Sequence, residues 1–168
     1  SITTGATIAW AMECRDQGVT LGDDEVPAFG DGAGLLATIE KIGRREGIGK
    51  LLAEGSRRAA ETVGQGSERW ALHVKGLELP GYDPRKLPTL ALGLAVATRG
   101  ACHNRSSAYE VDLSNQLPPD VAMHARAEAA IKAEDQATLL DSLNLCKFLR
   151  HCFDDLPEEA AQLFNLVS

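Results

Sequence analysis

The stretch Asp141-Ser-Leu-Asn-Leu-Cys146-Lys-Phe148 places a carboxylate and a thiol five residues apart in a leucine-rich segment. The apolar residues around it recur at helical spacing, so the sequence predicts a cysteine-bearing helix from about residue 135 to residue 153. A cysteine on the apolar face of a helix is most often a buried structural thiol. An aspartate such as Asp141 on such a helix is as often as not a plain surface carboxylate. By themselves, these residues therefore predict a core helix.

Working outward from this stretch, most of the chain has the pattern of short amphipathic helices. Thr3 or Thr4 is a candidate N-cap for the first helix, and Asp31 for the second. Residues 70–79 form the one strand-like stretch, and residues 104–119 resemble a long loop. The predicted helices cover approximately residues 6–17, 32–42, 48–52, 56–63, 89–98, 121–133 (capped by Asp120), 135–153, and a last one from 156.

These elements predict a mainly α, irregular multi-helical fold. The pattern of short helices is interrupted after Gly64-Gln-Gly66. Pro80, Pro84 and Pro88 then favour an extended, turn-rich segment. We expect two packed helical subdomains, residues 1–68 and 69–168, with at most one short strand-like segment.

Composition excludes several classes of function. The net charge of −7 argues against nucleic acid as a partner, because binding phosphates requires clustered lysine and arginine. No apolar run approaches the roughly 20 residues that span a bilayer, so we expect no membrane insertion. The four cysteines form no Cys-x-x-Cys pair, which is typical of a reducing cytoplasm rather than of a disulfide framework.

A second motif, Arg99-Gly-Ala-Cys-His103, lies upstream of the cysteine stretch, and Asp83-Pro-Arg85 precedes it. A lone histidine is more often a hydrogen-bonded structural residue than a catalytic one. Asp-Pro-Arg alone is at least as often a surface turn as a binding element.

Taken in order, however, these motifs resemble the C-terminal region of the tungsten-dependent aldehyde:ferredoxin oxidoreductases. Ser1-Ile-Thr-Thr-Gly and the helix after it, Leu52-Ala-Glu-Gly55 and His73-Val-Lys-Gly-Leu-Glu78 are also similar to elements of that family. The likeness covers nearly the whole chain, with residues 1–68 similar to part of the family's second domain and 69–168 to part of its third.

The resemblance assigns roles to individual residues. It implies that Cys146 is the last ligand of a [4Fe–4S] cluster, and that Asp141, Leu145 and Arg99 contact a tungsten-bound pterin. It also implies that His103 lies near the metal as a proton donor or acceptor. Asn144 stands where the family has glycine, and asparagine is the next best residue for a left-handed backbone position.

The resemblance further implies a tungsten-bis(molybdopterin) enzyme that oxidises aldehydes to carboxylates and passes electrons through the cluster to ferredoxin. A fragment of this kind requires an N-terminal pterin-binding domain, and a homodimer is one assembly open to it. One thiolate of four cannot hold a cluster, so we expect the 168 residues alone to bind no cofactor and to be inactive. A non-catalytic helical interaction or scaffold domain derived from the same family is the alternative.

Overall fold

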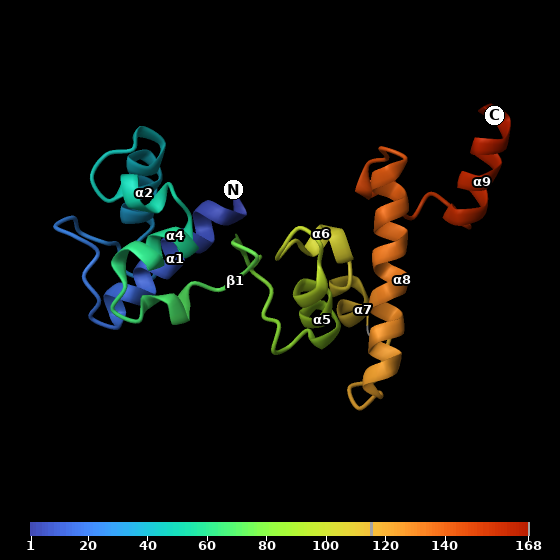
Figure 1. Cartoon of the computed structure of the whole chain (residues 1–168), viewed down its shortest axis with the longest axis horizontal. Coiled ribbons are helices and arrows are strands. Elements are labelled where there is room, and N and C mark those ends of the chain that lie inside the picture. The colour runs from blue at the N-terminus through green and yellow to red at the C-terminus, as the bar shows by residue number, and fades with distance from the viewer. Residues whose placement is uncertain (115, 168) are drawn as a thin grey trace. The chain divides into compact units, whose positions relative to one another are not determined.

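A computed structural model describes residues 1–114 and 116–167 (Figure 1). The chain folds into two compact units. The first consists of Ser1–Tyr82 together with Arg99–Ala101, and the second of Asp83–Thr98 together with the chain from Cys102 onward. Helices predominate in the described residues, which confirms the prediction of a mainly α fold. The predicted division at residue 68 into parts of two family domains remains a prediction.

The first unit contains four α-helices among its described residues and a two-stranded antiparallel sheet. Asp31 caps the second helix as predicted, because its Oδ1 accepts a hydrogen bond from the Gly34 N–H at 2.9 Å. The first helix begins earlier than predicted, with Ser1 rather than a threonine at its N-cap position. The elements are α1 (Ile2–Asp16), α2 (Gly32–Arg44), α3 (Gly49–Leu52), α4 (Ser56–Val63), a 3₁₀ turn (Ser67–Trp70), β1 (His73–Val74) and β2 (Leu77–Glu78).

The core of this unit packs around one face of α1. Trp10 is 3% exposed, and its indole N–H donates to the carbonyl oxygen of Ser67 at 3.0 Å, so the polar edge of the ring is satisfied inside the core. Apolar side chains from α3, α4 and the loops surround it. The buried members are Trp10, Ala11, Cys14, Leu21, Val26, Ile48, Leu52, Ala59, Ala60 and Ala71.

The strand-like stretch predicted at residues 70–79 folds as a tight hairpin, with Val74 opposite Leu77. Lys75 and Gly76 form its turn with φ of 54° and 84°, the left-handed pair that a type I′ turn requires. Glu78 is buried beside it and accepts hydrogen bonds from the Ser56 N–H at 2.8 Å and the Ser56 hydroxyl at 3.1 Å. The hairpin is thereby joined to the N-terminus of α4, where a carboxylate is favoured.

In the second unit, the short helices α5, α6 and α7 pack along the long helix α8, and α9 follows it (Figure 1). The elements are α5 (Pro88–Val96), α6 (His103–Ser106), α7 (Tyr109–Leu113), α8 (Met123–Ser142), a 3₁₀ turn (Lys147–Leu149) and α9 (Leu156–Val167).

Two predictions for this unit are wrong. The long loop expected over residues 104–119 contains α6 and α7, which are too short to show a helical period. The two helices expected at 121–133 and 135–153 are instead one helix, α8, which ends at Ser142. No break separates them, because residues 129–140 contain no proline or glycine.

A buried ion pair connects α5, α7 and α8. The Asp112 carboxylate accepts from the backbone N–H groups of Thr89 and Leu90, at 3.3 and 2.9 Å, and so caps the N-terminus of α5. Arg126 lies 3.6 Å from the same carboxylate, with both side chains under 10% exposed. Arg126 also donates to the carbonyl oxygens at positions 118 and 119, so its charge is well solvated by protein atoms.

Asp112→Ala should destabilise the second unit by about 3–5 kcal/mol, because it leaves the Arg126 charge buried without its partner and uncaps α5. Urea unfolding followed by circular dichroism measures the loss. Glu40→Ala, which removes a 3.9 Å surface pair with Arg44, is the control and should cost under about 0.5 kcal/mol. Equal effects of the two substitutions would contradict the assigned role of Asp112.

Candidate cofactor and catalytic site

The predicted cysteine-bearing helix stops before Cys146, because Asn144 adopts a left-handed conformation with φ of 56°. The Asn144 N–H donates to the Asp141 carbonyl at 3.1 Å, and the Leu145 N–H donates to the Leu140 carbonyl at 2.9 Å. These two bonds make a Schellman motif, in which a left-handed residue terminates a helix. Asn144 therefore adopts the type of backbone conformation that its glycine-like position suggested.

The consequence is that Cys146 lies outside the helix, on an extended residue with φ of −63° and ψ of 130°. Its thiol is free and exposed. The interpretation of Cys146 as a buried thiol on an apolar helix face is therefore wrong for this chain. Cys14, by contrast, is fully buried, and burial raises the pKa of its thiol to about 11, as expected for an inert structural cysteine.

His103 is the first residue of α6, where the chain turns after Cys102. Its half-buried ring lies against Tyr109, with the ring centroids 5.7 Å apart and the planes tilted by 55°. Burial lowers the pKa of His103 below its ordinary value, and the nearby positive charge of Lys147 lowers it further. Neutral imidazole is thus the favoured form near neutral pH, and one of its nitrogens can accept a proton.

The structure brings the segment after His103 together with the stretch that contains Cys146. Residues 141–146 are called the Cys box below. The Arg105 guanidinium lies 3.0 Å from the Asp141 carboxylate, before the turn at Asn144. The Lys147 ammonium donates to the Asn104 side-chain oxygen at 3.0 Å, directly after Cys146. Two motifs that lie some 40 residues apart in the sequence therefore form one site in the second unit.

A second layer of charges surrounds Lys147. Its ammonium lies 4.8 Å from the centre of the Tyr109 ring, a cation–π contact, and 3.7 Å from the Glu110 carboxylate. Arg150 binds the other oxygen of Glu110 at 3.0 Å. Burial lowers the pKa of Lys147, while the charge of Glu110 opposes that shift. Tyr109 is thus in contact with both His103 and Lys147.

The remaining candidates take different positions. Leu145 is half-buried as the residue after the left-handed turn. Arg99 is exposed and belongs to the first unit, whereas His103, Asp141 and Cys146 belong to the second. Next to Arg99, Gly100 (φ 104°) lies against the hairpin, where an added Cβ would come 2.5 Å from the Val74 carbonyl oxygen. Only glycine fits there, which accounts for the Arg-Gly pair.

Asp83-Pro-Arg85 forms a turn in which the backbone N–H and the guanidinium of Arg85 both bond the Asp83 carboxylate. Nε of Arg85 donates to Oδ1 of Asp83 and Nη2 donates to Oδ2, each at 3.0 Å. These hydrogen bonds lower the pKa of Asp83. Arg85 is 87% exposed. The turn therefore presents a fixed guanidinium, and the described contacts assign no substrate or cofactor to it.

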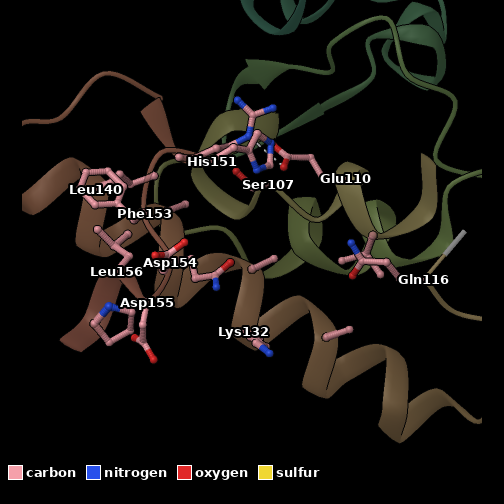
Figure 2. Close-up of a pocket in the computed structure, with 17 residues that line it drawn as sticks. Ser107, Glu110, Gln116, Lys132, Leu140, His151, Phe153, Asp154, Asp155 and Leu156 are labelled. Carbon is pink, nitrogen blue, oxygen red and sulfur yellow. Dashed lines mark hydrogen bonds and ion pairs between the residues drawn. The ribbon is translucent and has the colours of Figure 1, made fainter. Parts of the chain in front are cut away.

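A cavity of about 590 Å³ lies next to this cluster, between α7, α8 and the segment that leads to α9. Figure 2 shows Glu110, Ser107 and His151 on one side of it and Lys132 on α8 on another. Apolar side chains, including that of Leu140, line it together with charged groups of both signs. Glu110 both lines this cavity and pairs with Lys147.

Sequence reasoning missed Asn104, Arg105, Tyr109, Glu110 and Lys147. The one signal in the sequence that could have indicated them is their closeness to the motif residues. Arg105 follows His103 by two residues, and Lys147 follows Cys146 directly. Among the described residues, no group of three or more histidine, cysteine and acidic side chains is arranged to hold a metal ion. The site therefore offers one exposed thiol, Cys146, that could serve as one of the four ligands of a cluster. It also offers one carboxylate acceptor, Asp141.

Asn144→Ala should lower the free energy of unfolding of the second unit by about 1 kcal/mol, because a Cβ in the left-handed region is strained. Asn144→Gly should be neutral or slightly stabilising, since glycine adopts this conformation without strain. Parallel urea titrations of both variants measure the difference. An Ala variant as stable as the Gly variant would show that the turn is not left-handed in solution.

Comparison with known proteins identifies the family of this chain. Residues 1–168 match the family model described as aldehyde ferredoxin oxidoreductase, domains 2 & 3. The chain is 37% identical over 155 residues to a tungsten-containing aldehyde ferredoxin oxidoreductase of Pyrococcus furiosus, covering 88% of this chain and 25% of the relative. It is 36% identical over 156 residues to the enzyme of the same name from Thermococcus kodakarensis, with the same coverage.

A third relative, the WOR-like subunit of an aliphatic sulfonate oxidoreductase from Pyrococcus furiosus, is 32% identical over 116 residues, which is 64% of this chain and 18% of the relative. The chain spans about a quarter of the length of the aldehyde oxidoreductases that it matches. No described helix is long and apolar enough to cross a membrane. The match along the whole chain places this protein in the aldehyde ferredoxin oxidoreductase family, in the part that corresponds to domains 2 and 3.

Proposed function

We propose that this chain is the part of a tungsten-pterin oxidoreductase that contributes one cluster ligand and one proton-transfer group to a site completed by further polypeptide. The observation that supports this most directly is that α6, which begins with His103, contacts the Cys box through Arg105 and the residue directly after the box, Lys147, through Asn104. A histidine, an acceptor carboxylate and an exposed thiol are thereby grouped in one unit.

The residues present fit the groups that the family uses. A pterin ring is rich in N–H donors, and the ionised carboxylate of Asp141, which is about half exposed, accepts hydrogen bonds only. The Cys146 thiol is exposed on an extended segment, so it is accessible to a cluster whose other cysteine ligands come from outside this chain. Leu145, which is half-buried, is the second proposed pterin contact in this unit. Arg99 belongs to the first unit and is proposed as a pterin contact from the family resemblance alone. When bound, the pterin-held tungsten would supply the redox chemistry.

His103 suits proton transfer during aldehyde oxidation. Conversion of an aldehyde and water to a carboxylate releases two electrons and protons, so a base beside the reacting group is required. Burial and the charge of Lys147 keep the imidazole neutral, which prepares it to accept a proton. Tyr109 packs against the ring and limits its orientations.

We further propose ferredoxin as the electron acceptor, a small aldehyde as the substrate and the cytoplasm as the location, with the N-terminal pterin-binding domain and the other cluster ligands supplied by polypeptide outside these 168 residues. We also propose that the full-length protein forms a homodimer. The similarity to an aliphatic sulfonate oxidoreductase subunit favours an alternative substrate class, organic sulfonates, on the same cofactor.

In the full-length protein, Cys146→Ala should abolish or degrade the iron–sulfur cluster, because the remaining ligands cannot complete its coordination. Iron content and the electron paramagnetic resonance spectrum of the reduced protein measure the loss. Cys152→Ala is the matched control, since Cys152 is also exposed and lies six residues away. A Cys146→Ala protein with full iron content and an unaltered spectrum would remove Cys146 from the cluster.

His103→Phe in the full-length protein should lower kcat on the order of 10²–10⁴-fold, the usual cost of removing a general acid or base. Metal and pterin contents should stay normal, and the pH–rate profile should lose an ionisation that lies below the ordinary histidine range, in keeping with the lowered pKa of His103. Unimpaired turnover in a fully loaded variant would contradict the catalytic role. A purely structural histidine would instead give a poor yield and near-normal kcat in the folded fraction.

A further inference from the structure

Two contacts from α6 flank the Cys box, one at its first residue and one at the residue directly after it. Arg105 contacts Asp141 at the first residue, and Asn104 contacts Lys147 immediately after the last. Between these points the backbone makes the left-handed turn at Asn144, whose geometry is set by its own hydrogen bonds. The box is therefore fixed at both ends to the one-turn helix that begins with His103.

We propose that Arg105, Asn104 and Lys147 are positioning residues that set the location of the Cys box relative to His103. None of the three is assigned to cofactor or substrate. The proposal rests on the proposed function in one respect: fixing the box matters to chemistry only if Asp141, Cys146 and His103 act on a shared cofactor.

The Arg105 contact also determines how Asp141 faces its surroundings. Arg105 binds Oδ2 of Asp141, and in the described part of the chain Oδ1 has no hydrogen-bond partner. The guanidinium thus orients the carboxylate while one oxygen stays available as an acceptor. The Arg105 side chain is 24% exposed and that of Asp141 52%, so the guanidinium side of this pair is the part shielded from solvent.

Lys147 is fixed from three directions on the other end of the box. Asn104 accepts its hydrogen bond, the Tyr109 ring lies under its ammonium, and Glu110 provides the counter-charge. Glu110 is itself oriented by Arg150. All three partners of Lys147 lie within residues 104–110, so they couple the residue after Cys146 to the short segment that directly follows His103.

Amide hydrogen exchange in the 168-residue chain tests this without any cofactor. The Leu145 amide lies in the box and donates to the Leu140 carbonyl at the end of α8, so its exchange reports local opening. Lys147→Met and Arg105→Gln should each speed its exchange about three- to tenfold, the effect of losing a partly shielded ion pair. Lys147→Arg, which keeps the charge and the stacking on Tyr109, should restore most of the protection.

Lys132→Met is the matched control for Lys147→Met, since Lys132 is an exposed residue of α8 in the same unit. It should leave the Leu145 amide within twofold of the unsubstituted chain. The proposal is overturned if Lys147→Met and Arg105→Gln leave Leu145 within twofold, or if they accelerate core amides such as that of Leu94 by the same factor, because the substitutions would then act on global stability.

The positioning role of Arg105, Asn104 and Lys147 can fail without the cluster assignment of Cys146 failing, and the reverse also holds. If exchange at Leu145 responds as expected but Cys146→Ala retains its cluster in the full-length protein, then the positioning role stands and the cluster assignment fails. If Cys146→Ala loses the cluster while exchange at Leu145 is unchanged, then the assignment stands and these three residues do not fix the box.

Discussion

The left-handed backbone at Asn144 is the constraint on which the site depends. It ends α8 and turns the chain through two hydrogen bonds, so that Cys146 is presented on an extended, exposed residue. With an ordinary helical residue at this position, α8 would continue, and the thiol would follow the helical rotation beside Leu145 and Leu149. The Lys147–Asn104 contact lies after this turn, whereas Arg105 binds Asp141 within α8 before it.

In the second unit, paired polar groups join the helices, whose apolar side chains such as Leu90, Leu94 and Leu140 are also buried. Asp112 and Arg126 join α5, α7 and α8 in a shielded pair, and Glu110 joins α7 to Lys147 and Arg150. Such groups are costly to bury unless they are paired, so they specify one arrangement of short helices that apolar packing alone would leave undetermined. A site assembled on one-turn helices needs this specificity, since α6 and α7 have little intrinsic stability of their own.

The sequence predicted the elements whose signals are local. Asp31 has the side chain of an N-cap and acts as one, and the mainly helical character follows from the apolar spacing. The hairpin turn at Lys75-Gly76 was not predicted, because lysine in the left-handed region leaves no compositional signal. The end of α8 was misplaced because apolar residues at helical spacing continue past Asn144, at Leu145, Phe148 and Leu149, and asparagine is a weaker stop signal than glycine. The grouping of His103 with the Cys box came from family resemblance, whereas the contacts of Arg105 and Lys147 are tertiary and have no periodic signature.

The course of the chain has a further consequence. Residues 99–101 belong to the first unit although the residues before and after them belong to the second, and Gly100 occupies a place against the hairpin that only glycine fits. The boundary between the units is thus crossed three times by one polypeptide. Cleavage at the single bond after Tyr82 would not yield two self-contained pieces, because the first would lack a segment of its own fold. The two units are therefore inseparable as genetic modules, and an exchange of one of them between relatives has to transfer a discontinuous stretch of sequence.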